Sequence, residues 1–333
     1  MSDDIVTLPQ IKLEYFPEEG STALITLIDA GNPPPSFLRL IGAITKGIPE
    51  GFRAKTRVVF SGDFVSSVND RQIEDNAAAG SFTVERGSGV VAGKTMGRRP
   101  DGMVEILFPD SWIALEAPDD FLTMAEHLGT HEAVHATIHH LGGEPFWVNK
   151  RESFGYATLQ FVAMAADQAE EHLAEYLANQ VQFGTNGSGG STADQVKAAF
   201  DAWQSKVEVE LPAVPEDDPD YFFKGMVISF EALHILWKTL AYFASELRDG
   251  NNFKPVPDEI AALPEWEEEV APWWNEYTAL LAEIPMTVEQ DIAATDKVVK
   301  RLGLLLQEWA EGVGFEFHNN DSGGGFFRVT RWS

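Results

Sequence analysis

The first 115 residues place short apolar runs between turn-forming residues, a pattern that indicates strands mixed with short helices. The apolar run at 24–28 predicts a buried strand, and the residues 36–46 after it predict a short helix. Two further runs, at 56–60 and 103–108, are rich in Val, Ile, Leu and Phe and predict strands. This part of the chain therefore reads as β-rich with some helix.

From residue 118 the apolar spacing becomes helical. The sequence Pro-Asp-Asp at 118–120 suits a helix start, because Pro fixes φ and the acids complement the positive N-terminal dipole. This helix should run to about Leu141, where two glycines follow. A second long helix is predicted over 153–183, and the glycine- and serine-rich stretch 185–191 reads as a loop.

The remainder of the chain is predicted to be mainly helical. Near the C-terminus, 315–318 alternate apolar and polar residues, and 326–329 follow a glycine-rich turn, so the two runs predict a terminal β-hairpin. Four helical stretches precede the hairpin, near 192–206, 219–248, 265–284 and 287–311.

The net charge of the chain limits the classes of partner that it can bind. The 333 residues carry 24 basic and 52 acidic side chains, a formal net charge of −28. This balance argues against nucleic acid and against anionic membrane surfaces, since both require basic patches. The acidic excess indicates a solvated surface that aids solubility, and a cleft suited to basic substrates is the alternative interpretation.

The sequence lacks cysteine, and it lacks a recognisable signal or membrane-spanning segment. The chain contains no cysteine, which excludes disulfides and thiolate ligands, so any metal must be held by His, Asp or Glu. The acidic N-terminal residues 1–4 lack a basic start followed by an apolar stretch, and no apolar run reaches bilayer length. We therefore expect a soluble, cytoplasmic protein that does not act at a membrane; its oligomeric state is left open.

The most specific motif lies within the helix predicted from residue 118. The segment 131–135 reads His-Glu-Ala-Val-His, an HExxH pattern. Residues four apart share one helix face, so His131 and His135 can bind one zinc ion. Glu132 lies about 100° round the helix, where it can take a proton from a metal-bound water without ligating the metal. Ordinary histidines beside a surface glutamate are the alternative.

Further histidines extend the motif into an i, i+4 ladder. His127 and His139 lie four residues before and after the pair, and His140 stands beside them. His127 or His139 could add a ligand or a hydrogen bond to the metal site. We favour instead the interpretation that His139 and His140 complement the negative C-terminal end of the helix.

A third protein ligand is usual for catalytic zinc. The compact pattern with a third His ten residues after the first fails here, since position 141 is Leu and position 138 is Ile rather than Gly. The remaining source is a carboxylate from the following helix. There the chain resembles the gluzincin branch of the zincin metallopeptidases, in which the ligand Glu is often followed at +3 by a small residue and at +4 by an acid. The resemblance implies Glu171 as ligand, with Ala174 and Glu175 matching those positions.

The apolar periodicity of the same helix points to another candidate. Glu170 falls within an apolar stripe, whereas Glu171 lies towards its edge. A carboxylate inside such a stripe needs a partner, and a metal would serve. Glu170 therefore stays open as the third ligand, and the remaining candidates are Glu175, His172 and Asp167.

Weaker candidates lie outside the motif. Glu231 and His234 sit i, i+3 on a strongly apolar helix, where a satisfied buried polar pair is favoured over a His that stabilises an oxyanion. Tyr156 and Tyr176 could donate to an oxyanion, but we interpret both as packing residues. The glycines at 87–89 lack the strand and helix context of a phosphate loop and predict a turn.

These patterns predict an α+β fold, and the resemblance to the zincins implies how its parts are arranged. A small mixed β-sheet would pack on the HExxH helix, and a largely helical C-terminal half would close the other side of a cleft. The same resemblance implies that strand 103–108 is the sheet edge beside the zinc. Residues 1–117 are the β-rich N-terminal part of the catalytic domain, 118–190 the HExxH helix and the third-ligand helix, and 191–333 the mainly helical C-terminal part.

The function expected from this fold is that of a zinc-dependent metallopeptidase acting on a peptide or protein substrate. Water bound to Zn²⁺ would attack the peptide carbonyl with Glu132 as general base, and His131, His135 and Glu171 would hold the metal. The alternatives are a non-catalytic binding or structural protein on a zincin scaffold, and hydrolysis of a non-peptide amide.

Overall fold

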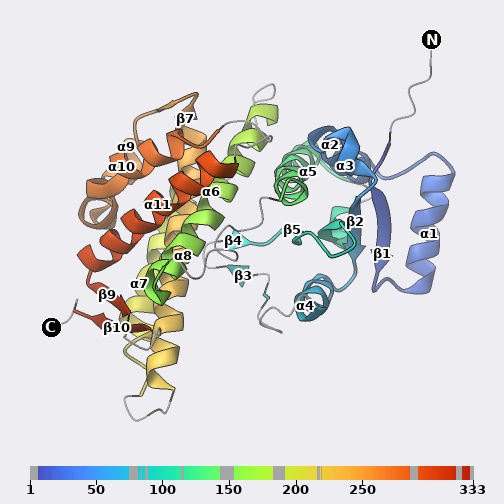
Figure 1. Ribbon diagram of the computed structural model, residues 1–333. Coiled ribbons are helices and arrows are strands. Elements are labelled where there is room, and N and C mark those ends of the chain that lie inside the picture. The colour runs from blue at the N-terminus through green and yellow to red at the C-terminus, as the bar shows by residue number, and fades with distance from the viewer. Residues whose placement is uncertain are drawn as a thin grey trace. The chain divides into compact units, whose positions relative to one another are not determined.

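A computed structural model describes most of the chain as two compact units (Figure 1). The N-terminal unit holds residues 1–86, 90–144 and 177–189, and the helical unit holds 87–89, 145–176 and 190–333. Each unit is considered by itself. The described residues are 7–74, 82–83, 85–86, 89–113, 116–142, 154–182, 192–215, 218, 220–285, 292–319 and 325–330.

A four-stranded mixed sheet forms the middle of the N-terminal unit. The predicted strands at 56–60 and 103–108 are confirmed as β2 (Thr56–Ser61) and β6 (Val104–Pro109). They pair in parallel, with β1 (Gln10–Glu14) parallel on one side and the short β5 (Lys94–Thr95) antiparallel on the other. The expectation that strand 103–108 is the sheet edge was wrong, because β5 covers that edge.

Both faces of the central strands β2 and β6 are buried, which explains their uninterrupted apolar runs. Alternate side chains such as Val58 and Ile106 pack with α2 (Pro35–Gly47) and α5 (Asp119–His140). Their neighbours Val59 and Leu107 pack with α4 (Phe64–Glu74) on the opposite face. The unit is therefore a sheet between two helical layers, as Figure 1 shows.

One predicted strand is a helix. Residues 24–28 lie within α1 (Glu18–Asp29), followed by α2 and the single turn α3 (Glu50–Arg53). Leu24 is buried and Ile28 packs on the core, whereas Ile25 is 49% exposed. The side chains thus follow the 3.6-residue period of a helix, which a short apolar run cannot distinguish from a strand. The helix predicted over 36–46 is confirmed as α2.

A buried carboxylate joins three strands to α4. Glu105 of β6 is 1% exposed and accepts hydrogen bonds from Arg71 Nε (2.7 Å), Arg57 Nη1 (2.8 Å) and Arg99 Nη1 (3.1 Å). Arg71 also pairs with Glu14 of β1 at 2.9 Å. Burial by itself would raise the pKa of Glu105, but the hydrogen bonds and charges of the arginines lower it. The carboxylate therefore stays ionised and ties these elements together.

Two glycine contacts bring α5 unusually close to α2. A Cβ at Gly129 would lie 2.8 Å from the backbone oxygen of Leu40 and 3.0 Å from Ala43 Cβ. A Cβ at Gly47 would lie 2.7 Å from Ala133 Cβ. Only hydrogen fits at these positions, so the face of α5 that carries residues 129 and 133 is pressed against α2.

The helical unit confirms the remaining predicted helices. The long helices pack around five buried tryptophans, Trp203, Trp237, Trp266, Trp274 and Trp309. The helix predicted near 192–206 continues into a π-helical segment at Ser205–Glu210, and the stretch predicted near 265–284 contains another at Trp266–Val270. The helices are α6 (Tyr156–Gln182), α7 (Thr192–Gln204), α8 (Tyr221–Leu247), α9 (Asp258–Ala261), α10 (Ala271–Ala282) and α11 (Ile292–Gly312).

Short strands complete the fold. The predicted terminal hairpin is confirmed as β9 (Phe315–Asn319) paired antiparallel with β10 (Gly325–Val329). Further two-residue strands are β3 (Glu85–Arg86), β4 (Gly89–Val90), β7 (Arg248–Asp249) and β8 (Asn252–Phe253). The predicted loop at 185–191 and the first two residues of the predicted turn at 87–89 lie outside the described residues. No described helix combines the length and apolar character needed to cross a membrane.

Replacing Gly129 by alanine should destabilise the protein. The new methyl group meets backbone on α2, so we expect a loss of about 1–3 kcal/mol in the free energy of unfolding, measured by urea denaturation. Gly42→Ala on α2 is the matched control, because a Cβ there meets nothing within 4 Å. The control should gain about 0.5–1 kcal/mol from helix propensity. Equal effects of the two substitutions would contradict the close-packing argument.

Candidate metal centre

The motif helix α5 has the ends that its sequence predicts. It begins after Pro118, with Asp119 and Asp120 in its first turn. It ends at His140, and Gly142 follows with a φ of +78°, the left-handed conformation that favours glycine after a helix. The motif residues 131–135 therefore lie in regular helix.

The two motif histidines present their ring nitrogens to the same point. The Nε2 atoms of His131 and His135 are 3.0 Å apart, and each residue is 9% exposed. Their face of α5 lies roughly opposite the Gly129 and Ala133 face that packs on α2. Tetrahedral zinc with bonds of about 2.0–2.1 Å sets two ligand nitrogens about 3.3–3.4 Å apart. The imidazole pair is therefore close to the spacing that zinc requires.

Glu132 is held by the edge of the sheet. Its carboxylate Oε2 accepts a hydrogen bond of 2.6 Å from Thr95 Oγ1 of β5, and the residue is 5% exposed. Oε1 faces Gly93, where a Cβ would lie only 2.9 Å away. The sequence prediction missed Thr95 and Gly93, because they lie almost forty residues before Glu132 and carry no motif. Thr95 fixes the direction of the carboxylate, and Gly93 packs against Oε1 more closely than a larger residue could.

His140 has a structural role instead of the expected role at the helix dipole. Its Nε2 lies 2.9 Å from Thr56 Oγ1, and its ring stacks on Phe52 with centroids 4.8 Å apart. Burial, followed by the positive charge of Arg98, lowers the pKa of His140 to about 4. A neutral imidazole adds no charge to the C-terminal end of α5, so that interpretation was wrong for His140.

Glu171 lies on α6 in the helical unit, which is described by itself. The residue is 8% exposed, and its two carboxylate oxygens accept hydrogen bonds from α8. Oε1 lies 2.6 Å from Lys238 Nζ, and Oε2 lies 2.7 Å from the Tyr242 hydroxyl. One turn earlier, Asp167 pairs with Lys238 at 3.3 Å and with His234 at 3.4 Å. Side chains of α6 and α8 are thus joined by a row of ion pairs and hydrogen bonds.

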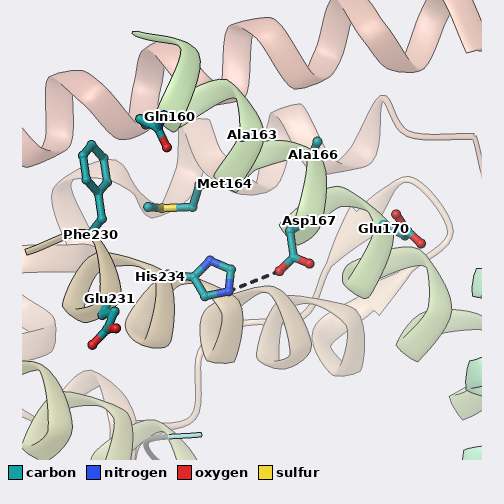
Figure 2. A pocket seen from close by; sticks show the side chains of 9 residues that line it. All are labelled: Gln160, Ala163, Met164, Ala166, Asp167, Glu170, Phe230, Glu231 and His234. Carbon is teal, nitrogen blue, oxygen red and sulfur yellow. Dashed lines mark ion pairs between the residues drawn. The ribbon is translucent and has the colours of Figure 1, made fainter. Parts of the chain in front are cut away.

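Glu170 is less buried than the apolar stripe predicts. It is half-buried in the wall of a pocket of about 440 Å³ between α6 and α8, whereas Glu171 is buried. The apolar periodicity of α6 predicted the wrong order of burial for the two carboxylates. The polar partners that allow Glu171 to be buried come from α8, and the sequence of α6 alone does not reveal them. Figure 2 shows the residues that line this pocket, which are Gln160, Ala163, Met164, Ala166, Asp167, Glu170, Phe230, Glu231 and His234.

His172 faces the core of the helical unit. It is fully buried, with Nδ1 3.1 Å from the backbone oxygen of Ala241 and Nε2 2.9 Å from Arg248 Nη1. Burial, followed by the charge of Arg248, lowers the pKa of His172 to about 3. Because both ring nitrogens have protein partners, His172 serves as a structural residue rather than as a metal ligand.

The weaker candidates have partners of their own. Glu231 is exposed and pairs with Lys206 at 3.0 Å, whereas His234 of α8 points to Asp167 of α6 (Figure 2). The expectation that Glu231 and His234 form a buried pair was therefore wrong. Tyr156 packs against the apolar core, and Tyr176 lies 5.5 Å below the Arg248 guanidinium.

Comparisons with protein-family models, curated proteins and solved structures give no match for this chain.

The neutral His140 predicts a pH dependence of stability. Its folded-state pKa is about 4, below its ordinary value of 6.5, so the unfolded chain takes up the proton first as the pH falls. His140 therefore lowers the free energy of unfolding progressively between pH 6.5 and pH 4. His140→Gln removes this titration, and its urea-unfolding profile should fall less steeply than that of the parent over this range. Parallel profiles would contradict the assignment of a buried neutral His140.

Proposed function

We propose that the chain is a zinc-dependent hydrolase, and specifically a metallopeptidase that resembles the gluzincins. The observation that carries the proposal is the arrangement on α5. His131 and His135 bring two ring nitrogens within 3.0 Å, and Glu132 between them is aimed by Thr95. A purely structural metal site has no need of a carboxylate held beside its ligands, so this arrangement favours catalysis over the binding-protein alternative.

Glu171 is the proposed third ligand. The resemblance to the gluzincins implies Glu171 of α6 as the carboxylate that would complete the two imidazoles of His131 and His135. Two imidazoles and a carboxylate are a ligand set typical of catalytic zinc.

The chain's own residues supply the proton transfers. Bound zinc would polarise the scissile carbonyl and lower the pKa of its water. Oε2 of Glu132 accepts the hydrogen bond from Thr95, so the other oxygen, Oε1, would accept the proton of the attacking water. The same carboxylic acid then donates this proton to the leaving amine. The reaction thus needs no other acid or base.

A peptide is the substrate that best suits the N-terminal unit. The strand β5 stands at the edge of the sheet, next to β6 on one side. Its residue Thr95 bonds the proposed general base. An extended peptide that pairs with such an edge would present its carbonyl groups beside Glu132.

Metal analysis and hydrolysis assays test the proposal. The purified protein should contain about one zinc per chain, and His131→Ala and His135→Ala should each lose it. Glu132→Gln should retain the zinc and the fold but lose hydrolysis of a peptide library, since it removes the base and not a ligand. His318→Ala, at an exposed position on β9, is the control and should keep zinc and activity. A parent protein without zinc would overturn the proposal.

The third ligand is tested by a pair of neighbouring substitutions. Glu171→Ala should weaken zinc binding by about a hundredfold or more, because it removes one bond to the metal. Glu170→Ala, at the pocket wall, should leave the zinc affinity close to that of the parent. Competition with a chromophoric chelator measures both affinities. A strong loss in Glu170→Ala with little change in Glu171→Ala would give the role to Glu170.

A further inference from the structure

The two oxygens of the Glu171 carboxylate have different partners on α8. Lys238 and Tyr242 are four residues apart and so share one face of that helix. Lys238 Nζ lies 2.6 Å from Oε1, and the Tyr242 hydroxyl donates to Oε2 at 2.7 Å. Two short contacts on opposite oxygens restrict both the position of the carboxylate and its rotation.

The charges around this contact are balanced between the two helices. Lys238 lies between two carboxylates, Asp167 at 3.3 Å and Glu171 at 2.6 Å. Because Lys238 is shared with Asp167, it links the helices whether or not Glu171 binds a metal.

Tyr242 acts as a neutral donor. A tyrosine hydroxyl is neutral near pH 7, since its ordinary pKa is about 10. The Tyr242 hydroxyl therefore donates a hydrogen bond to Oε2 of Glu171, 2.7 Å away. A carboxylate oxygen that accepts one hydrogen bond still has a second lone pair for a metal. The hydrogen bond from Tyr242 is thus compatible with metal coordination by Glu171.

We propose that Tyr242 is a positioning residue that orients Glu171 for metal binding, an inference that rests on the proposed zinc site. Hydrogen bonds to a ligating side chain reduce the freedom that the ligand loses when the metal binds. The hydroxyl of Tyr242 holds Oε2 while Lys238 holds Oε1, so the carboxylate is oriented before the metal arrives. The contact belongs to the metal site as well as to the packing of α6 on α8.

A neighbouring contact between the same two helices provides a matched control. His234 contacts Asp167 at 3.4 Å, also between α8 and α6, but two turns before Tyr242 (Figure 2). A substitution that removes this contact alters the same helix pair without removing a partner of Glu171. His234→Gln therefore separates helix packing from the orientation of the ligand.

The deciding experiment measures the zinc affinity of Tyr242→Phe by chelator competition. This substitution removes one hydroxyl and keeps the ring, and we expect the affinity to fall about tenfold, at the lower end of effects of this kind. His234→Gln should keep the affinity of the parent. The melting temperature of each metal-free variant reports whether it folds. Equal zinc affinities of Tyr242→Phe and the parent would overturn the inference and leave the zinc site standing.

A double-mutant cycle tests whether Tyr242 acts through Glu171. In the Glu171→Ala background, Tyr242→Phe should cause no further loss of zinc affinity, because the carboxylate that it orients is gone. A further tenfold loss in that background would show an independent effect of Tyr242 and contradict the inference. If the parent chain binds no zinc, the proposed function fails first, and this inference fails with it.

Discussion

The close packing of α5 on α2 is the constraint on which the candidate site depends. Gly129 and Gly47 leave no room for a side chain between the two helices, so one face of α5 is committed to that contact. The motif histidines are thereby turned to the opposite side of the helix, and Glu132 is turned towards β5. A larger residue at either glycine would rotate or displace α5, and all three motif side chains would move with it.

Partners from other elements determine which polar side chains can be buried. Glu105 is held by three arginines, and Glu171 is held by a lysine and a tyrosine. In both cases the cost of removing a carboxylate from water is offset by charges and hydrogen bonds from neighbouring strands or helices. Glu132 differs, since its partner Thr95 is neutral and holds only one oxygen. The proposed general base therefore keeps an oxygen for chemistry.

The histidines divide into two groups with different chemistry. His140 is buried with Nε2 beside Thr56, His172 is buried with partners at both ring nitrogens, and burial keeps both residues neutral. These two histidines stabilise the core and do not serve as metal ligands. His131 and His135 have their Nε2 atoms directed at each other at 3.0 Å, an arrangement that a shared metal ion would stabilise. The same residue type thus serves packing at two positions and forms the proposed metal-binding pair at two others.

Local periodicity was sufficient for the long helices, the two central strands and the placement of His131 and His135 on one face, because helix and strand spacing is a property of neighbouring residues. It was insufficient for residues 24–28, where a short apolar run fits both periods. The relative burial of Glu170 and Glu171 depends on Lys238 and Tyr242, about seventy residues later in the chain. The hydrogen bond from Thr95 to Glu132 and the identity of the edge strand depend likewise on segments that are far apart in the sequence. Tertiary structure alone decided these points, since hydrogen-bond partners and packing neighbours come from elements that local sequence does not contain.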